Sequence, residues 1–214
     1  MMNTTPTPAT APKNPRSRRR RYLWTAMLVA LLIFLLGVHP FLAISEPVDA
    51  NTMVVEGWVP AYVLDAAIAE FRRGHYTHIF VSGLEIEGLP ETDDARATRY
   101  LVTSGGIAAT RVIPVPAAAT EFNRTSHMAR AIRDRMHALG LQPAGVNVVT
   151  LGPHARQSKL AYGRLLGAAT PVGVISIPKD DYNATFWWAS AAGIKKTTKD
   201  FAAWVKEVLF GLRS

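Results

Sequence analysis

The chain has 214 residues, enough for one domain with a full core and one small additional element, and it contains no cysteine, which excludes disulfides and thiolate metal sites. Its formal net charge of +8 would suit a nucleic-acid-binding protein, but residues 1–44 hold six basic residues and no acidic ones. From Ser45 onward 18 basic residues stand beside 16 acidic ones, so this part is nearly neutral and a nucleic-acid partner is not expected.

The N-terminal residues predict a membrane anchor. Residues 1–21 are rich in Thr, Pro and Ala and end in four arginines, which indicates a disordered basic tail. Residues 22–44 are uncharged. At about 1.5 Å per residue they would cross a hydrocarbon core of about 30 Å as a helix. We expect an uncleaved transmembrane signal anchor; a cleaved signal peptide is the alternative, because "AIS" at 43–45 has the spacing of a cleavage site.

The charges that flank this anchor predict its orientation. Arginines precede the apolar run and none follows it directly, which places the N-terminus in the cytoplasm by the positive-inside rule. The expected partner of residues 22–44 is therefore a lipid bilayer, crossed once. Residues 45–214 would form a domain on the periplasmic, or extracytoplasmic, side.

Short apolar runs alternate with helical patterns throughout residues 45–214. The runs are continuous, which indicates parallel strands buried on both faces. The expected strands are 52–57, 77–83, 111–115, 146–152 and 172–178. The expected helices between them are 60–73, 92–103, 123–139 and 154–166. A last helix is expected to cover the core with one apolar stripe, formed by Phe201, Trp204, Val205, Val208, Leu209 and Leu212. Pro114 makes 111–115 an edge strand, because proline cannot donate to a ladder. We predict a three-layer, Rossmann-like α/β domain with a mostly parallel sheet.

In such sheets ligands bind beyond the carboxyl ends of the strands, where the strand order reverses. The most basic of the turns at this edge is "GPHARQSK" at 152–159, which holds His154, Arg156 and Lys159. Basic residues are unfavourable at a helix N-terminus unless an anion compensates them. The turn therefore indicates an anion site, and the alternative is that Arg156 and Lys159 simply face water.

Other motifs carry less information. His75 and His78 lie three residues apart, but two histidines without a nearby third ligand indicate surface residues, so no metal site is predicted. Trp187 and Trp188 could stack on a sugar or a partner, although core packing is expected for at least one of them.

The order of five motifs resembles the bacterial ElyC/SanA/YdcF family, the domain of unknown function 218. The motifs are "MVVEGW", "AIAEFRRGHYTHIFVSG", "DDA", "NRT" at the start of a helix, and "VVTLGPHARQS", which together cover about residues 50–180. The resemblance implies a Rossmann-like fold, an N-terminal span in several members, and a role in envelope integrity linked to peptidoglycan or polysaccharide synthesis. It also implies that the membrane crossed by residues 22–44 is a bacterial inner (plasma) membrane, with the domain on its periplasmic side. One branch is associated with S-adenosylmethionine, but no agreed reaction comes with the family and no cofactor is predicted here.

Position by position, the resemblance implies site residues in each turn. These are Glu56, Gly57, Ser82, Gly83, Asp94, Thr125 and His154. The chain departs from the family pattern at Trp58, which follows a single glycine where a pair is usual, and at His127 and Met128, which replace a Glu–Asn pair. Gln157 stands where an arginine is usual, and Arg156 lies one residue earlier.

We therefore expect an envelope protein that acts on or binds a phosphate-bearing cell-wall or polysaccharide precursor. Arg124, Arg156 and Lys159 would clamp anionic oxygens, with Thr125 and helix N–H groups as further donors. His154 would act as general acid or base, and Glu56 or Asp94 would orient it or share this catalytic role. Otherwise Glu56 is a buried acid at a strand end and Asp94 a first-turn helix carboxylate. Gly57, Ser82, Gly83 and Gln157 complete the predicted ligand-binding set.

The alternative function is a non-catalytic module of the envelope. In that case the same crevice would bind a nucleotide-like ligand or a glycan, or would serve as a scaffold for envelope synthases. The adjacent tryptophans favour this alternative, because such side chains often stack on sugars or partners.

Overall fold

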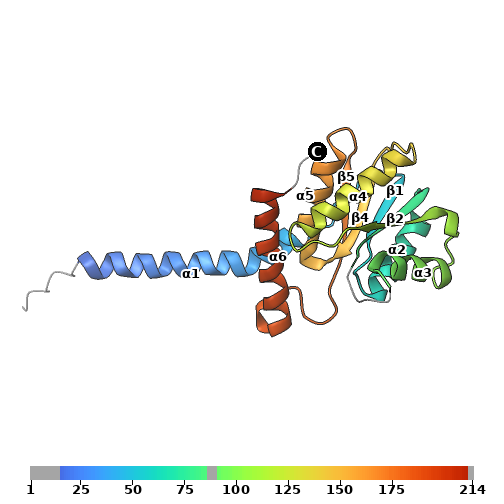
Figure 1. Ribbon diagram of the computed structural model, residues 1–214. Helices are drawn as coiled ribbons and strands as arrows, with labels where there is room; N and C mark the ends of the chain where they lie inside the picture. The colour runs from blue at the N-terminus through green and yellow to red at the C-terminus, as the bar shows by residue number, and fades with distance from the viewer. Residues whose placement is uncertain (1–14, 86–90, 212–214) are drawn as a thin grey trace, which may run out of the picture. The chain divides into compact units, whose positions relative to one another are not determined.

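The computed structural model describes residues 15–85 and 91–211, with side chains from residue 18 onward. The chain divides into two compact units, Met1–Gly37 and Val38–Ser214. The second unit holds the whole sheet and its helices (Figure 1).

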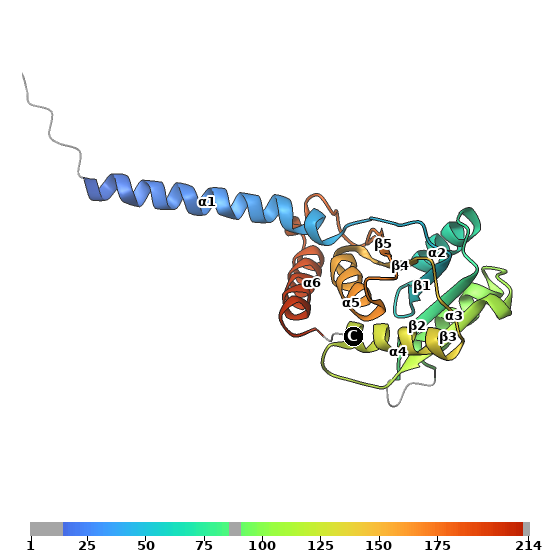
Figure 2. The ribbon, with the colours of Figure 1, turned by 90° about the horizontal axis from the view of Figure 1, so that it is seen from above.

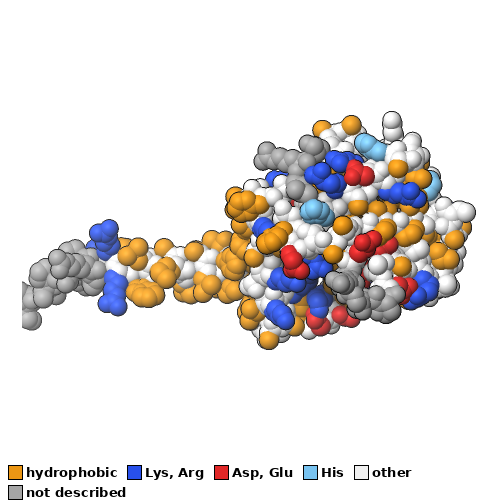
Figure 3. Space-filling view, viewed as in Figure 1, with side chains coloured by type: hydrophobic (Ala, Val, Ile, Leu, Met, Phe, Trp, Pro, Cys, Tyr) orange, Lys and Arg blue, Asp and Glu red, His pale blue; other side chains and the backbone are white. Residues whose placement is uncertain are grey.

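Helix α1 (Pro15–Leu42) contains the predicted anchor. Its part from Arg18 to Leu42 has a mean hydropathy of 2.3 over an 18-residue window and is long and apolar enough to cross a membrane. Hydrophobic side chains cover most of this helix and basic ones lie near its start (Figure 3). The helix ends two residues before the predicted limit of 22–44. Of the tail predicted to be disordered, residues 1–14 lie outside the described residues and residues 15–21 are helical.

The last turn of α1 belongs to the second unit. Val38, His39 and Leu42 are buried there, with Leu42 fully inaccessible. The domain therefore begins at Val38, earlier than the predicted boundary at 45, because the end of the apolar helix contributes to its core.

Five parallel strands form one sheet. They are β1 (Thr52–Glu56), β2 (His78–Leu84), β3 (Val112–Ala117), β4 (Val146–Leu151) and β5 (Val172–Ile177), in the order β3-β2-β1-β4-β5. This order confirms the predicted Rossmann-like fold and places the strand that contains Pro114 at an edge. The order reverses between β1 and β4, the position at which ligands bind in such sheets.

Helices cover both faces of the sheet. Helices α2 (Ala61–Arg73) and α3 (Asp93–Thr103) pack on Met53 and Val55, whereas α4 (Arg124–Ala138) and α5 (Ala155–Leu166) pack on Val54. Successive side chains of a strand point to opposite faces of the sheet. A continuous apolar run therefore packs against the helices on both faces. Three short 3-10 helices, Ala109–Arg111, Gly152–His154 and Trp187–Ala189, complete the connections, and Trp187 is buried as expected for one of the pair.

Helix α6 (Ala191–Phe210) lies against α5 (Figure 2). Its buried positions are Gly193, Thr197, Asp200 and Glu207, three of which are polar. The predicted orientation of this helix is therefore wrong: Val208 and Leu209 of the apolar stripe are exposed, and Phe201, Trp204 and Val205 are only half-buried. Leu212, also assigned to the stripe, lies outside the described residues.

Candidate functional site

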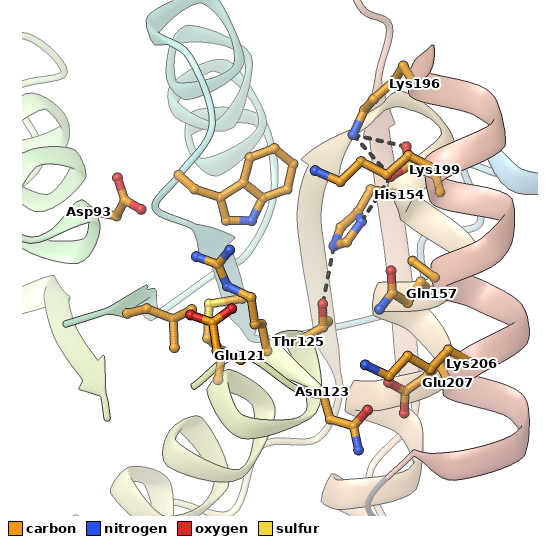
Figure 4. Close-up of a pocket in the computed structure, with 16 residues that line it drawn as sticks. Asp93, Glu121, Asn123, Thr125, His154, Gln157, Lys196, Lys199, Lys206 and Glu207 are labelled. Carbon is orange, nitrogen blue, oxygen red and sulfur yellow. Dashed lines mark hydrogen bonds and ion pairs between the residues drawn. The ribbon is translucent and has the colours of Figure 1, made fainter. Parts of the chain in front are cut away.

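A cavity of about 460 Å³ lies where α4, α5 and α6 meet the carboxyl ends of the strands (Figure 4). It is lined by residues from six segments of the chain: Trp58, Leu84, Asp93, Glu121, Asn123, Arg124, Thr125, Met128, His154, Gln157, Lys196, Lys199, Asp200, Ala203, Lys206 and Glu207. The beginnings of α4 and α5 both contribute to this wall. Helix N-termini carry free N–H groups and partial positive charge, which suits an anionic ligand.

His154 occupies the centre of the polar contacts. Gly152, at φ +52°, turns the chain out of β4 into a 3-10 turn that ends at His154, directly before α5. The Nε2 atom lies 3.3 Å from Thr125 Oγ1 and 3.7 Å from Glu56 Oε2, and Nδ1 lies 3.6 Å from Asp200 Oδ1. Each ring nitrogen thus faces a carboxylate, an arrangement that orients an imidazole for proton transfer.

Glu56 is a fully buried carboxylate at the end of β1. Thr150 donates to its Oε2 and Ser158 donates to its Oε1 over 2.9 Å. These donors satisfy a charge that would be costly to bury alone. Glu56 is thus the buried acid at a strand end that its structural interpretation predicts. It is also a neighbour of His154, as its functional interpretation predicts, so the two interpretations are compatible.

Asp200 of α6 is the carboxylate that the sequence prediction missed. It is 2 % exposed and contacts His154, and Lys196 Nζ lies 2.9 Å from its Oδ2. Burial raises the pKa of this carboxyl, but the hydrogen bond and charge of His154 and the charge of Lys196 outweigh burial and hold the pKa below its ordinary value. Asp200 therefore remains ionised beside His154.

The depressed pKa of Asp200 predicts how stability depends on pH. An ionised carboxylate with a lowered pKa stabilises the fold above its unfolded pKa, about 3.9, and this contribution is lost as the pH falls through the lower folded value. We expect the melting-temperature difference between wild type and Asp200→Asn to be largest above about pH 4 and to shrink below it. Asp134→Asn, at a carboxylate whose side chain is 58 % exposed, is the control. A difference that stays constant across this pH range would contradict the assignment.

Four cationic side chains line the cavity. Lys196, Lys199 and Lys206 extend from α6, as Figure 4 shows, and Arg124 begins α4. Lys196 is paired with Asp200, whereas Lys199 and Arg124 make no ion pair with any residue that the structure describes. Of the lining acids, Glu207 is buried and accepts hydrogen bonds from Ser126 over 2.8 and 2.9 Å. Two further acids, Asp93 and Glu121, also line the cavity. The groups left to meet a ligand are thus three cations, Lys199, Lys206 and Arg124, and these two acids, so positive charge is in slight excess.

Arg156 and Lys159 do not line the cavity, contrary to the prediction that they clamp its ligand. Arg156 donates to the carbonyl of Phe41 and stacks its guanidinium 3.9 Å from the Phe41 ring centre. Lys159 pairs with Glu46 over 2.5 Å. Helical spacing explains the division, because His154 and Gln157 share the side of α5 that faces the cavity. Arg156 and Lys159 point elsewhere and contact Phe41, in the last turn of α1, and Glu46, just after it.

Gln157 lies in the cavity wall without the charge of the arginine that the family resemblance implies. The side chain is 7 % exposed, and its Oε1 has no hydrogen-bond partner among the described residues. Arg156 does not replace that arginine, because it turns to Phe41. A buried acceptor of this kind suits a ligand that carries a hydroxyl or an N–H group.

The remaining predicted residues form the frame beside the cavity and do not line it. Gly57 N–H donates to the Ser82 carbonyl over 2.7 Å, and the Tyr162 hydroxyl donates to Ser82 Oγ over 3.2 Å. A Cβ at Gly83 would lie 2.4 Å from the Asp94 backbone nitrogen, so glycine is needed for α3 to begin there. Asp94 is a buried first-turn carboxylate, which matches its structural interpretation, and its neighbour Asp93 faces the cavity instead.

One feature of the sequence could have revealed the α6 residues. Thr197, Asp200 and Glu207 recur at helical spacing in the last helix, so this helix carries a polar stripe as well as an apolar one. The prediction that this helix covers the core rests on the apolar stripe alone and does not consider the polar one. No group of three or more His, Asp or Glu side chains in the described part of the chain is arranged to hold a metal ion.

The cavity places one histidine between two carboxylates, beside cationic side chains and two helix N-termini. This arrangement can bind an anion and transfer a proton to or from it. Comparisons of the chain with family models, with curated proteins and with solved structures give no significant match.

Proposed function

We propose that the chain is a membrane-anchored envelope protein of the ElyC/SanA/YdcF type whose cavity acts on or binds a phosphate-bearing cell-wall or polysaccharide precursor. The observation that supports it most directly is His154, held between Glu56 and Asp200 in a cavity lined by Arg124 and three lysines. Helix α1 would cross the bacterial inner membrane once, with its N-terminus in the cytoplasm and the domain outside.

In this proposal the cations bind the phosphate oxygens and His154 transfers the proton. Arg124, Lys199 and Lys206 would contact the anion together with N–H groups at the starts of α4 and α5. His154 presents Nε2 to the Thr125 side of the cavity, while Asp200 faces Nδ1 and stabilises the protonated ring. Glu56 holds the ring from the sheet side. Lys196 neutralises Asp200 and is less available to the ligand.

Gln157 and Trp58 favour a second candidate, a binding module without turnover. Trp58 lies edge-on to His154, with ring centres 5.2 Å apart, and presents an aromatic surface in the cavity wall. Together with the buried Gln157 acceptor, it suits a nucleotide-like or glycan ligand. The same cations would then hold a phosphate group that is never cleaved.

Anion binding can be tested without knowing the substrate. Inorganic pyrophosphate would be titrated calorimetrically into the full chain in detergent. Hydrogen bonds to charged groups contribute about 1.5–3 kcal/mol, so Lys199→Ala and Arg124→Ala are each expected to weaken binding roughly 10- to 100-fold. Lys195→Ala removes the same charge from an exposed position of α6 outside the cavity wall and is expected to bind as the wild type does. Equal affinities in all four proteins would refute the anion site.

A further inference from the structure

The side chains of α6 fall into three groups. One group is buried, a second faces the cavity, and a third is apolar and faces away from the cavity. Lys196, Lys199 and Lys206 lie on the side that faces the cavity. The apolar stripe of α6, defined here as Phe201, Trp204, Val205, Val208 and Leu209, lies on the other side. With 3.6 residues per turn, the two sets fall on roughly opposite sides of the helix axis. The cavity and the apolar stripe are therefore separated by the thickness of one helix.

The apolar stripe is a surface feature. Val208 is 38 % exposed and Leu209 64 % exposed, and Figure 3 shows hydrophobic side chains on the surface of the domain over α6. Phe201 and Trp204 pack on each other with ring centres 6.0 Å apart and are half-buried. A contiguous apolar patch of this kind on a folded domain indicates a binding surface for another apolar phase or a partner.

The patch is continuous with the end of the apolar helix. Phe41, in the last turn of α1, packs edge-on against Trp204 with ring centres 5.0 Å apart. Val38 and Leu42, in the same helical turns as Phe41, are buried in the domain. If the part of α1 up to Gly37 crosses a bilayer, Phe41 lies four residues, about 6 Å, beyond it along the helix. Trp204 lies within ring contact of Phe41. Aromatic side chains are enriched at that depth.

Arg156 supplies a positive charge at the same place. Its guanidinium covers the ring of Phe41 and donates to the Phe41 carbonyl, so it lies beside the end of the apolar helix. Arginine at a membrane interface contacts lipid phosphates while its stem packs on apolar groups. Arg156, which the sequence predicts to bind the ligand of the cavity, therefore lies where lipid headgroups would be.

We propose that the apolar stripe of α6, together with Phe41 and Arg156, seats the domain on the surface of the bilayer that α1 crosses. This inference rests on the proposed membrane anchor. Because a helix with its side chains is about 10–12 Å thick, the cavity on the other side of α6 lies about that far from the headgroups. A cell-envelope precursor at the membrane surface would then be within reach of the cavity without leaving the interface.

The absence of cysteine allows a direct test on the full chain. Single variants Val208→Cys and Leu209→Cys would be labelled with an environment-sensitive fluorophore and reconstituted in vesicles of phosphatidylcholine and phosphatidylglycerol in equal amounts. Lipids with a nitroxide near the headgroup end of the acyl chain serve as quencher for labels at the membrane surface, and lipids with a nitroxide near the methyl end serve as quencher for the label at 31. Leu139→Cys, at the C-terminal end of α4 and 42 % exposed, is the aqueous control, and Leu31→Cys, within the apolar helix and 52 % exposed, is the membrane control.

Each outcome is decisive. The proposal requires labels at 208 and 209 to be quenched several times more strongly than the label at 139. Quenching at 31 without quenching at 208 and 209 would leave the anchor intact and overturn the seating of α6. Absence of quenching at 31 would overturn the anchor and, with it, this inference, whereas the pyrophosphate titration would still test the cavity separately.

Discussion

Under the proposed function, a His154→Ala variant is expected to lower turnover of a phosphate-bearing precursor by about 10²- to 10⁴-fold, the usual contribution of a positioned general acid or base. The imidazole is the group that joins the two carboxylates of the site, with Nε2 3.7 Å from Glu56 and Nδ1 3.6 Å from Asp200. Alanine leaves both carboxylates in place but removes the proton carrier. Phosphate release from undecaprenyl-linked and nucleotide-linked precursors would measure the effect.

His127→Ala is the matched control for this variant. His127 lies in α4, two residues after Thr125, and is half-buried, but it does not line the cavity. Its replacement should leave turnover within a few-fold of wild type. Undiminished turnover in His154→Ala would exclude His154 as the proton carrier. Absence of turnover in the wild type, combined with cavity-dependent pyrophosphate binding, would support the non-catalytic binding module instead.

A Leu42→Ala variant is expected to destabilise the domain by about 2–5 kcal/mol, the range for removing a fully buried leucine side chain from a core. Leu42 is fully inaccessible although it ends the apolar helix that would cross the membrane. His39, in the same turn, adds a hydrogen bond of 3.0 Å between its Nε2 and the Tyr182 hydroxyl. The effect would be measured by urea unfolding of the full chain in detergent.

Leu36→Ala provides the control, since Leu36 is 63 % exposed and belongs to the first unit. It should change the free energy of unfolding by less than about 0.5 kcal/mol. The result also bears on the alternative of a cleaved signal peptide. Cleavage after Ser45 would remove Val38, His39 and Leu42 from the domain core, so a processed domain of residues 46–214 should be less stable than one of residues 38–214. Equal stabilities would contradict the role of the last turn of α1 in the core and would favour the cleaved-signal alternative.

The layout of the sheet could be predicted because it depends on local patterns. Each strand is a short continuous apolar run, and each helix between strands shows apolar residues at helical spacing, so the alternation of elements follows from the order of residues alone. The position of His154 follows in the same way, since it comes directly after the strand that ends at Leu151. Glu56 could be placed nearby because the carboxyl ends of parallel strands share one edge.

The division of the basic turn required the structure. The sequence places His154, Arg156, Gln157 and Lys159 within six residues, and all of them were assigned to one site. Helix α5 turns two of them to the cavity and two away from it. Arg156 and Lys159 contact Phe41 and Glu46, which lie more than a hundred residues earlier in the chain. A local sequence pattern cannot predict such contacts.

The sequence by itself therefore determined the class of fold, the apolar helix long enough to cross a membrane and the edge of the sheet at which the site lies. Only the tertiary structure decided which face of α6 is buried. Both stripes of this helix have helical spacing, and hydrophobicity alone favours burying the apolar one. The polar stripe is buried because Asp200 meets His154, and Glu207 meets Ser126, in positions created by α4 and α5. A charge can be buried where such partners exist, and only the assembled fold supplies them.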